Sequence, residues 1–310
     1  MGLLILLAVA LAMIVLAGAA FIAYTLLHPP RKTFAVAIAR HLPTDPQALG
    51  LPFTEQRFQL SNGLWSDGWI MEGGDASGPL VIFTHGWGDS RFGALTWVPV
   101  IAPRAGRVVV YDVRGHGDSP ARISRLGNAE ARDLLALMDQ IDAGDPLDHA
   151  PVVLWGHSLG AGTAIAAAAL DGRRESPRVA GVVADGVCRT LSEPVAAQLR
   201  SRGLPAFAFV PLARLALAAR LGIWVLHDNV ATDAAELRCP LLLLHGGADP
   251  ICEVTSARGV AEAAADGRVE VFEDGRHGDL VDVDRQRYRD VIDRFLVSVS
   301  PLPTSDGSTA

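Results

Sequence analysis

The chain has 310 residues, of which 50% are hydrophobic and 20% are charged, a length and composition that suit one large globular domain with an appendage. Its formal net charge is −7. Since it also lacks a stripe of Lys and Arg to neutralise phosphates, nucleic acid is excluded as an expected partner.

The N-terminus is strongly apolar. Residues 3–27 contain no charged side chain, and a helix of this length would cross a hydrocarbon core of about 30 Å. We therefore predict a single-pass transmembrane helix over residues 3–27. Arg31, Lys32 and Arg40 follow this run and no basic residue precedes it, so positive-inside counting places the rest of the chain in the cytoplasm. The alternative is a signal peptide cleaved near residues 17–19, which would leave a secreted or periplasmic protein.

The next segment connects this helix to the domain. Residues 28–52 are predicted to be a linker or a short amphipathic segment, because His-Pro-Pro at 28–30 breaks the helix. An antiparallel hairpin over 57–72 is indicated by its Asn-Gly turn. Beyond it, strands alternate with helices, which is typical of a doubly wound α/β fold. Helices are expected near residues 92–102, 128–141, 158–170, 254–265 and 285–299.

Two buried strands, at 80–84 and 108–111, each end in a glycine-rich loop. The loops read His-Gly-Trp-Gly-Asp at 85–89 and Asp-Val-Arg-Gly-His-Gly-Asp-Ser at 112–119. They hold four side chains that could ligate a divalent ion: His85, Asp89, Asp112 and His116. No helical histidine pair or cysteine pair accompanies them, so we expect structural turns and no metal.

The sequence Gly-His-Ser-Leu-Gly at 156–160 lies between an apolar strand at 152–155 and an alanine-rich helix. A sharp strand-to-helix turn needs glycine on both sides of Ser158, because its strained backbone leaves no room for a Cβ atom. Such a turn lifts the serine oxygen beside a helix N-terminus, where free N–H groups favour negative charge. The pattern is typical of an acyl-transferring serine. The alternative is a tight turn in which Ser158 only caps the helix.

The stretch 188–238 is too long for a simple crossover, so we predict an inserted helical cap over the site. Within it, residues 204–226 are apolar but are interrupted by two prolines and two arginines, so a second membrane span is not expected. This segment is either ordinary cap core or a hydrophobic lid that accepts acyl chains or touches the bilayer.

Two further candidates follow Ser158 in chain order. Asp249 comes after a buried strand at 240–244, and His277 after a strand at 269–272, at the edge where parallel sheets bind ligands. His277 can accept the serine proton near neutral pH, and Asp249 can orient the imidazole. Four other acidic residues could replace Asp249, or make this simply a solvated acidic loop: Asp274, Asp279, Asp282 and Asp284.

An oxyanion formed in acyl transfer needs two N–H donors. Leu159, the residue after the serine, supplies one. We expect the amide of Trp87 to supply the other, because Gly86 and Gly88 let the backbone turn it inward. The alternative is a glycine-rich turn with a buried tryptophan.

Little chemistry is expected from the cysteines or the C-terminal tail. Cys188, Cys239 and Cys252 are widely spaced and odd in number, so we expect buried apolar residues without a disulfide framework or a zinc site. Residues 300–310 are small and polar, and we expect them to be disordered.

In this order, the motifs resemble the alpha/beta-hydrolase fold superfamily over roughly residues 55–298. The resemblance rests on the segments 85–88, 112–119, 156–160, 247–249 and 275–277. It implies a mostly parallel eight-stranded sheet with helices on both faces, a domain over 53–299, a serine hydrolase triad and no cofactor. Ser158 argues against the branches that use an aspartate nucleophile.

The leading hypothesis is a membrane-anchored serine hydrolase that cleaves a small-molecule ester, thioester or amide through an acyl-Ser158 intermediate. One alternative is a serine peptidase for short peptides, with cap carboxylates binding the α-amine. The cap offers Glu193, Asp228, Asp233 and Glu236 for this role. Another is a catalytically inactive, membrane-anchored binding protein. The sequence leaves the oligomeric state open.

Overall fold

A computed structural model describes residues 1–144 and 150–300. Its centre is one eight-stranded sheet in the order β1-β2-β4-β3-β5-β6-β7-β8. Strands β1 and β2, and β2 and β4, pair antiparallel, and the remaining neighbours pair parallel. This confirms the predicted fold class. The strands are β1 Phe53–Gln59, β2 Trp65–Glu72, β3 Leu80–Thr84, β4 Arg107–Tyr111, β5 Val152–His157, β6 Val179–Asp185, β7 Leu241–Gly246 and β8 Gly267–Phe272.

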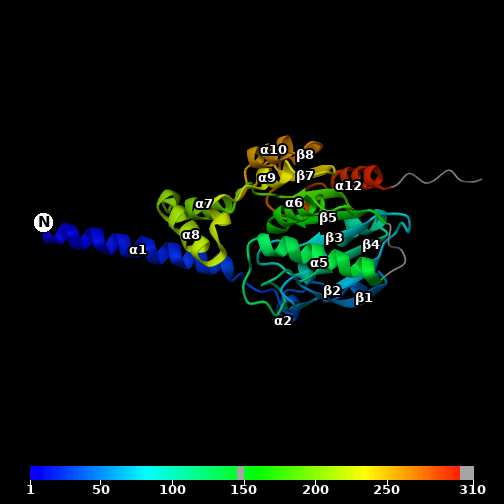
Figure 1. Cartoon of the computed structure of the whole chain (residues 1–310), viewed down its shortest axis with the longest axis horizontal. Helices are drawn as coiled ribbons and strands as arrows, with labels where there is room; N and C mark the ends of the chain where they lie inside the picture. Colours follow the sequence, from blue (N-terminus) through cyan, green and yellow to red (C-terminus); the bar gives the residue numbers. More distant parts are fainter. Residues whose placement is uncertain (145–149, 301–310) are drawn as a thin grey trace, which may run out of the picture.

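Helices cover both faces of the sheet (Figure 1). Those longer than one turn are α1 Gly2–Leu27, α2 Phe34–Ala39, α5 Asn128–Gly144, α6 Leu159–Asp171, α7 Ser192–Ser201, α8 Ala206–Leu221, α9 Val230–Ala234, α10 Val254–Ala263 and α12 Arg285–Val299. The short ones are α3 Arg91–Ala94, α4 Val98–Ile101 and α11 Leu280–Val283, with 3₁₀ turns at Pro46–Leu49, Ala102–Arg104 and Ile223–Leu226.

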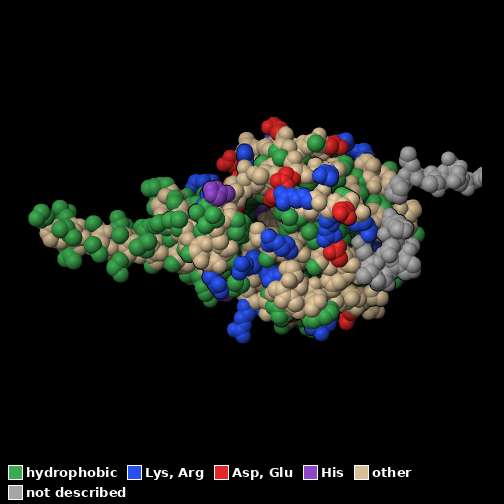
Figure 2. Space-filling model, in the orientation of Figure 1, with side chains coloured by type: hydrophobic (Ala, Val, Ile, Leu, Met, Phe, Trp, Pro, Cys, Tyr) green, Lys and Arg blue, Asp and Glu red, His purple; other side chains and the backbone are tan. Residues whose placement is uncertain are grey.

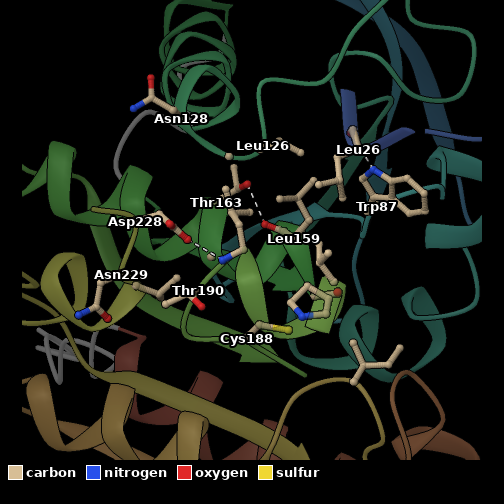
Figure 3. A pocket seen from close by; sticks show the side chains of 18 of the residues that line it. Leu26, Trp87, Leu126, Asn128, Leu159, Thr163, Cys188, Thr190, Asp228 and Asn229 are labelled. Atoms are coloured by element: carbon tan, nitrogen blue, oxygen red, sulfur yellow. Dashed lines mark hydrogen bonds between the residues drawn. The ribbon is translucent and has the colours of Figure 1, made fainter. Parts of the chain in front are cut away.

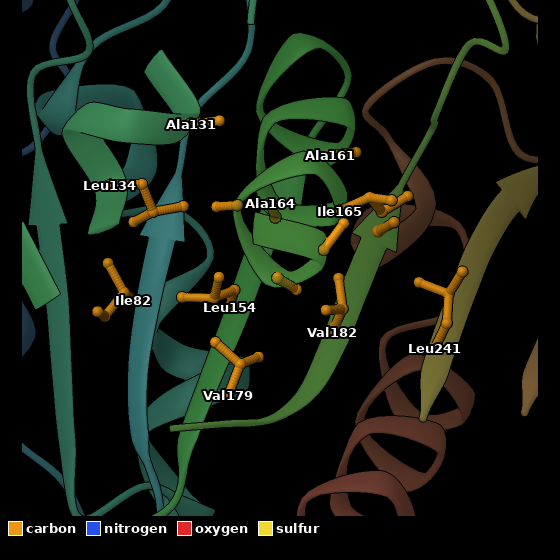
Figure 4. Close-up of a cluster of buried hydrophobic side chains, with 14 of the residues drawn as sticks. Ile82, Ala131, Leu134, Leu154, Ala161, Ala164, Ile165, Val179, Val182 and Leu241 are labelled. Carbon is orange, nitrogen blue, oxygen red and sulfur yellow. The ribbon is translucent and has the colours of Figure 1, made fainter. Parts of the chain in front are cut away.

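Two apolar layers hold the sheet. On one face, Ala164 and Ile165 of α6 pack over Leu154 and Val182 of the central strands (Figure 4). On the other face, α4 and α12 pack on the same strands, with Trp155 fully buried. Because strands β3 and β5 to β8 are parallel, their carboxyl ends meet at one edge, where the loops with the candidate residues lie.

The helix predicted over residues 92–102 is wrong as a continuous element. The structure has α3, then α4, then a 3₁₀ turn in its place. Pro99 lies in the first turn of α4 and Pro103 in the 3₁₀ turn. Each proline lacks an N–H donor and restricts the residue before it, so the segment breaks into short turns.

Helix α1 extends away from the domain (Figure 1), and within the described residues it is the one helix long and apolar enough to cross a membrane. Figure 2 shows hydrophobic side chains along its length. The following segment, predicted as a linker or amphipathic segment, contains α2 and is held to the domain. Arg31 donates to the Gly117 carbonyl at 2.9 Å, and Lys32 pairs with Asp89 at 2.8 Å.

The cysteine expectation is wrong for two of the three residues. Cys188 and Cys252 form a disulfide with their Cα atoms 5.0 Å apart, although 64 positions separate them in the sequence. Cys239 is a free, half-buried thiol. The pairing depends on two loops that meet at the same edge of the sheet, which spacing alone does not reveal. The tail predicted to be disordered lies, from residue 301, outside the described residues.

Candidate active site

Ser158 lies in a strained turn between β5 and α6. Its φ angle is 54°, a left-handed value that is unusual for a residue with a side chain. The flanking glycines explain how the turn fits. A Cβ atom on Gly156 would lie 2.0 Å from the Gly160 carbonyl oxygen, and one on Gly160 would lie 2.0 Å from the Thr84 carbonyl oxygen. The turn therefore requires both glycines of the motif.

The structure brings Ser158, His277 and Asp249 together. His277 Nε2 lies 2.9 Å from Ser158 Oγ, and His277 Nδ1 lies 2.8 Å from Asp249 Oδ2. The three side chains come from loops after β5, β7 and β8. They form a continuous relay in which a proton can pass from the hydroxyl to the imidazole.

Asp249 is built to remain ionised. Its side chain is 1% exposed, and burial by itself raises the pKa of a carboxyl. The hydrogen bond and charge of His277 oppose this, and the amides of Ile251 and Cys252 donate to Asp249 Oδ1 at 2.7 and 3.1 Å. The pKa of Asp249 is therefore below its ordinary value. Asp249 can thus stabilise an imidazolium at neutral pH.

The other acidic residues near His277 have different contacts. Asp279 accepts from the Arg276 amide at 2.6 Å, and Asp284 caps α12 by accepting from the Arg287 amide at 3.0 Å. Asp282 is exposed and faces Arg285 at 3.7 Å. Among the described residues, Asp249 is the one whose carboxylate lies within hydrogen-bond distance of His277 Nδ1.

Two backbone amides are available near Ser158. Leu159 is the first residue of α6, so its amide has no acceptor within the helix. The Trp87 amide follows Gly86 and precedes Gly88, whose φ of 73° turns the loop. Both residues line the same cavity as Ser158. The Trp87 indole is 40% exposed and donates to the Leu26 carbonyl at 3.1 Å, so the alternative of a buried tryptophan does not hold.

A second histidine and carboxylate pair lies beside the first, and sequence reasoning missed it. His157 Nδ1 is 3.3 Å from Asp185 Oδ1, and its ring centre is 5.1 Å from that of His277. Asp185 also accepts a hydrogen bond of 2.8 Å from the buried Tyr288 hydroxyl. Burial, followed by the charge of Asp185, raises the pKa of Tyr288. A signal was present, because His157 is in the serine motif and Asp185 ends a strand.

The four side chains considered for a metal are engaged in the loops. His85 Nε2 accepts from the Val113 amide at 3.0 Å, and Asp112 accepts from the Arg91 amide at 2.9 Å. Burial lowers the pKa of His116 to about 3. Among the described residues, the group close enough to share an ion is Asp249, Cys252 and His277, but the Cys252 sulfur is in the disulfide.

A cavity of about 1060 Å³ opens beside Ser158 and His277. It is bounded by α1, by the start of α5, by α6, and by α7, α8 and α9 of the segment 188–238. Figure 3 shows Trp87 and Leu26 on one side, Asp228 and Asn229 on the other, and Leu159 between them. Its volume is at the upper end of small-molecule sites, which are about 300–1,000 Å³.

Two of the four acidic residues in the segment 188–238 line this cavity, Asp228 and Asp233. Asp228 is already paired, since its Oδ1 lies 2.9 Å from Arg214 Nη2. Burial, and then the charge of Glu236, raises the pKa of Asp233. Because Asp228 is engaged by Arg214, Asp233 is the better placed of the two to meet an amine in the cavity.

Comparisons with known proteins agree with this architecture. A family model described as alpha/beta hydrolase fold matches residues 79–209, and one described as serine aminopeptidase, S33, matches residues 214–284. An uncharacterized protein of Mycobacterium tuberculosis strain H37Rv is 28% identical over 248 residues, 79% of each chain.

Two further comparisons involve proteins whose names state an activity. The lysophosphatidylserine lipase ABHD12 of Rattus norvegicus is 28% identical over 234 residues, which cover 73% of this chain and 56% of that protein. The Pyrococcus furiosus esterase Pf2001 has a TM-score of 0.72 at 21% identity, over 89% of this chain and 99% of that one. The structural similarity shows the fold, and the lipase match spans little more than half of that relative.

Proposed function

The chain belongs to the alpha/beta-hydrolase fold superfamily, and from this premise we propose that it is a membrane-anchored serine hydrolase acting through an acyl-Ser158 intermediate. The observation that carries the proposal is the relay of hydrogen bonds, at 2.9 and 2.8 Å, from Ser158 through His277 to Asp249. Lipases and esterases among its relatives support a hydrolase. We propose a body over residues 53–299 with a cap over about 188–238.

In the first half of the reaction, Ser158 Oγ attacks the acyl carbonyl carbon while His277 Nε2 takes its proton. Asp249 holds the imidazole and stabilises its positive charge. The carbonyl oxygen becomes an oxyanion, which accepts hydrogen bonds from the Trp87 and Leu159 amides. The tetrahedral intermediate then collapses. The bond to the leaving group breaks, His277 donates its proton to the alcohol, thiol or amine, and Ser158 stays acylated.

In the second half, water replaces the leaving group. His277 Nε2 takes a proton from the water as its oxygen attacks the acyl carbon. A second oxyanion forms in the same place, and its collapse releases a carboxylic acid as His277 returns the proton to Ser158 Oγ. The cycle consumes one water and leaves the enzyme unchanged.

An acyl ester is the bond we favour, because the cavity beside Ser158 is large and mostly apolar and a lipase is among the relatives. The peptidase alternative has a specific observation behind it as well. Asp233 lines the cavity and the S33 family model covers residues 214–284. Comparing acyl esters with aminoacyl amides separates the two. Faster turnover of the amides, lost in Asp233→Asn, would select the peptidase.

The test of the proposal is Ser158→Ala in the full-length protein, solubilised in detergent. We expect a loss of turnover of about 10⁴-fold or more and no labelling by a fluorophosphonate probe. Ser298→Ala is the matched control, because Ser298 is on α12 and outside the cavity. If Ser158→Ala keeps probe labelling, the proposed nucleophile is wrong. A wild-type protein without labelling or turnover would favour the inactive binding protein.

Helix α1 fits a membrane anchor by length and composition. We propose that the domain lies outside the cytoplasm, in contrast to the orientation expected from Arg31, Lys32 and Arg40. The Cys188–Cys252 disulfide supports this, because disulfides persist in oxidising compartments and are rare in the cytosol. An alkaline phosphatase fused to the C-terminus in a bacterial host should be active. A fluorescent green fluorescent protein fusion, with an inactive phosphatase fusion, would reverse the orientation.

A further inference from the structure

The last third of α1 is packed as part of the domain. Ala19, Ala23 and Leu27 are buried, and Ala23 and Leu27 share an apolar cluster with Leu217 and Leu221 of α8. Close approach is possible because the helix carries small residues at this face. A Cβ atom on Gly18 would lie only 2.6 Å from the ring of Phe209. The helix is therefore fixed against the cap at a defined rotation.

A neighbouring face of the same turns lines the cavity of the candidate active site. Gly18, Phe21, Ile22, Thr25 and Leu26 all contribute to a wall that also contains Ser158 and His277. Cap residues complete this apolar end, among them Leu199, Phe209 and Trp224. An extended apolar group bonded at Ser158 thus has a path along the helix that anchors the protein.

The end of α1 is hydrogen-bonded to the loop that carries the expected oxyanion donor and to a second loop at Ser124. The Leu26 carbonyl accepts from the Trp87 indole at 3.1 Å (Figure 3), and the Leu27 carbonyl accepts from the Ser124 amide at 2.9 Å. Pro30 packs against Gly88 of the same loop. These contacts fix the C-terminal end of α1 beside the candidate active site.

Outside the domain, the apolar surface of α1 continues onto the cap (Figure 2). Residues 2–17 project for about 24 Å at 1.5 Å per residue, which is about four fifths of the roughly 30 Å hydrocarbon thickness of a bilayer. Phe207 is 83% exposed near the junction, and three further large apolar side chains of the cap are exposed: Leu204, Leu215 and Ile223. Exposed apolar groups beside a membrane span are suited to the lipid interface.

We infer that the substrate is a membrane lipid with a long acyl chain, which enters the cavity from the bilayer and lies against residues 18–26 while its ester reaches Ser158. This inference rests on the proposed function and adds the substrate class and the acyl site. The membrane helix is thereby a wall of the acyl site, and chain-length preference depends on it.

The experiment compares palmitoyl and acetyl esters as substrates of the full-length protein in lipid nanodiscs. Ile22→Trp fills the cavity where the chain should lie. Each methylene withdrawn from water contributes about fourfold to binding, so displacing about three of them lowers kcat/KM for the palmitoyl ester roughly sixtyfold. The acetyl ester lacks those methylenes, so the ratio of the palmitoyl to the acetyl kcat/KM should fall by the same factor. Leu11→Trp is the matched control, since Leu11 is 63% exposed on the projecting part of the same helix.

The outcomes separate the two proposals. An unchanged palmitoyl rate in Ile22→Trp, an equal fall for both esters, or an equal fall in Leu11→Trp would overturn the acyl site on α1. Hydrolysis of the acetyl ester that survives Ser158→Ala would instead refute the proposed nucleophile, whatever Ile22→Trp does.

A second measurement covers the case in which Ile22→Trp does not fold. A long-chain alkyl fluorophosphonate with a terminal diazirine reacts with wild-type protein, as fluoride leaves and the Ser158 Oγ–phosphorus bond forms. Irradiation then links the chain end to the residues that surround it. Peptide mapping should find the adduct on α1, in residues 2–27. Adducts confined to α5, α6 or α9 would overturn the inference.

Discussion

Removing the Cys188–Cys252 disulfide should destabilise the domain substantially. The bridge joins the loop after β6 to the loop of Asp249, across 64 positions of sequence. Closing a loop of that length in the unfolded chain removes about 14 cal/mol/K of entropy, which is about 4 kcal/mol at 25 °C. With a urea m value of about 2–3 kcal/mol/M, the double variant Cys188→Ala, Cys252→Ala should unfold at about 1.5–2 M less urea.

The assay is urea unfolding of the detergent-solubilised full chain, followed by tryptophan fluorescence with and without reductant. Reductant should lower the wild-type midpoint to that of the double variant and leave the double variant unchanged. Cys239→Ala is the control. Because Cys239 is a free thiol, this variant keeps the disulfide, and its unfolding midpoint should respond to reductant like that of the wild type. Equal midpoints for wild type and double variant would refute the reasoning. So would three titratable thiols in the denatured, unreduced protein, where one is expected.

Three further predictions concern the site and its loops. Asp249→Asn should lower kcat by about 10⁴-fold, because the imidazole of His277 loses the charge that orients it. Steady-state kinetics measures this loss, and an unchanged circular dichroism spectrum shows that the variant is folded. Gly160→Ala should give little folded protein, since its Cβ would meet the Thr84 carbonyl at 2.0 Å, and an alanine variant that purifies with full activity would contradict the turn geometry. Burial lowers the pKa of His116 from 6.5 to about 3. Below pH 6.5 the unfolded chain therefore binds a proton that the folded chain does not, and stability falls by about 1.4 kcal/mol per pH unit towards pH 3. In His116→Asn, the midpoint of urea unfolding should therefore vary less with pH between 6.5 and 3 than in the wild type. An identical pH dependence in the two proteins would contradict a neutral His116 in the folded chain.

Much of the fold could be predicted because its signals are local. Each central strand is a short apolar run ended by glycine or a polar loop, and the structure confirms such strands at β3, β5 and β7. The turn at Ser158 is equally local, since the steric demand on Gly156 and Gly160 arises within five residues. The chain order of serine, aspartate and histidine then predicted which side chains would meet. Parallel strands bring their carboxyl ends to one edge, so order along the chain becomes proximity.

What the sequence did not reveal depends on contacts between distant loops. The disulfide joins cysteines that lie in unrelated motifs, and their pairing follows from the meeting of two loop ends. The bond from Tyr288 to Asp185 spans 103 positions and connects a helix outside the motifs to the strand beside Ser158. Polarity patterns describe which residues are buried. They do not identify the partner that a buried polar group will find.

Helix α1 also shows the difference between what the local sequence predicts and what contacts with distant segments decide. Its sequence is apolar on every side, so hydropathy predicts a membrane helix and cannot distinguish a face that contacts lipid from one that contacts protein. The distinction lies in residue size. Gly18, Ala19 and Ala23 let α8 approach, whereas the larger Phe21 and Ile22 border the cavity. Small residues grouped on one face of an apolar segment therefore indicate a helix that packs on its own domain. Under the proposed function, such a helix would bring the bilayer to the edge of the cavity beside Ser158.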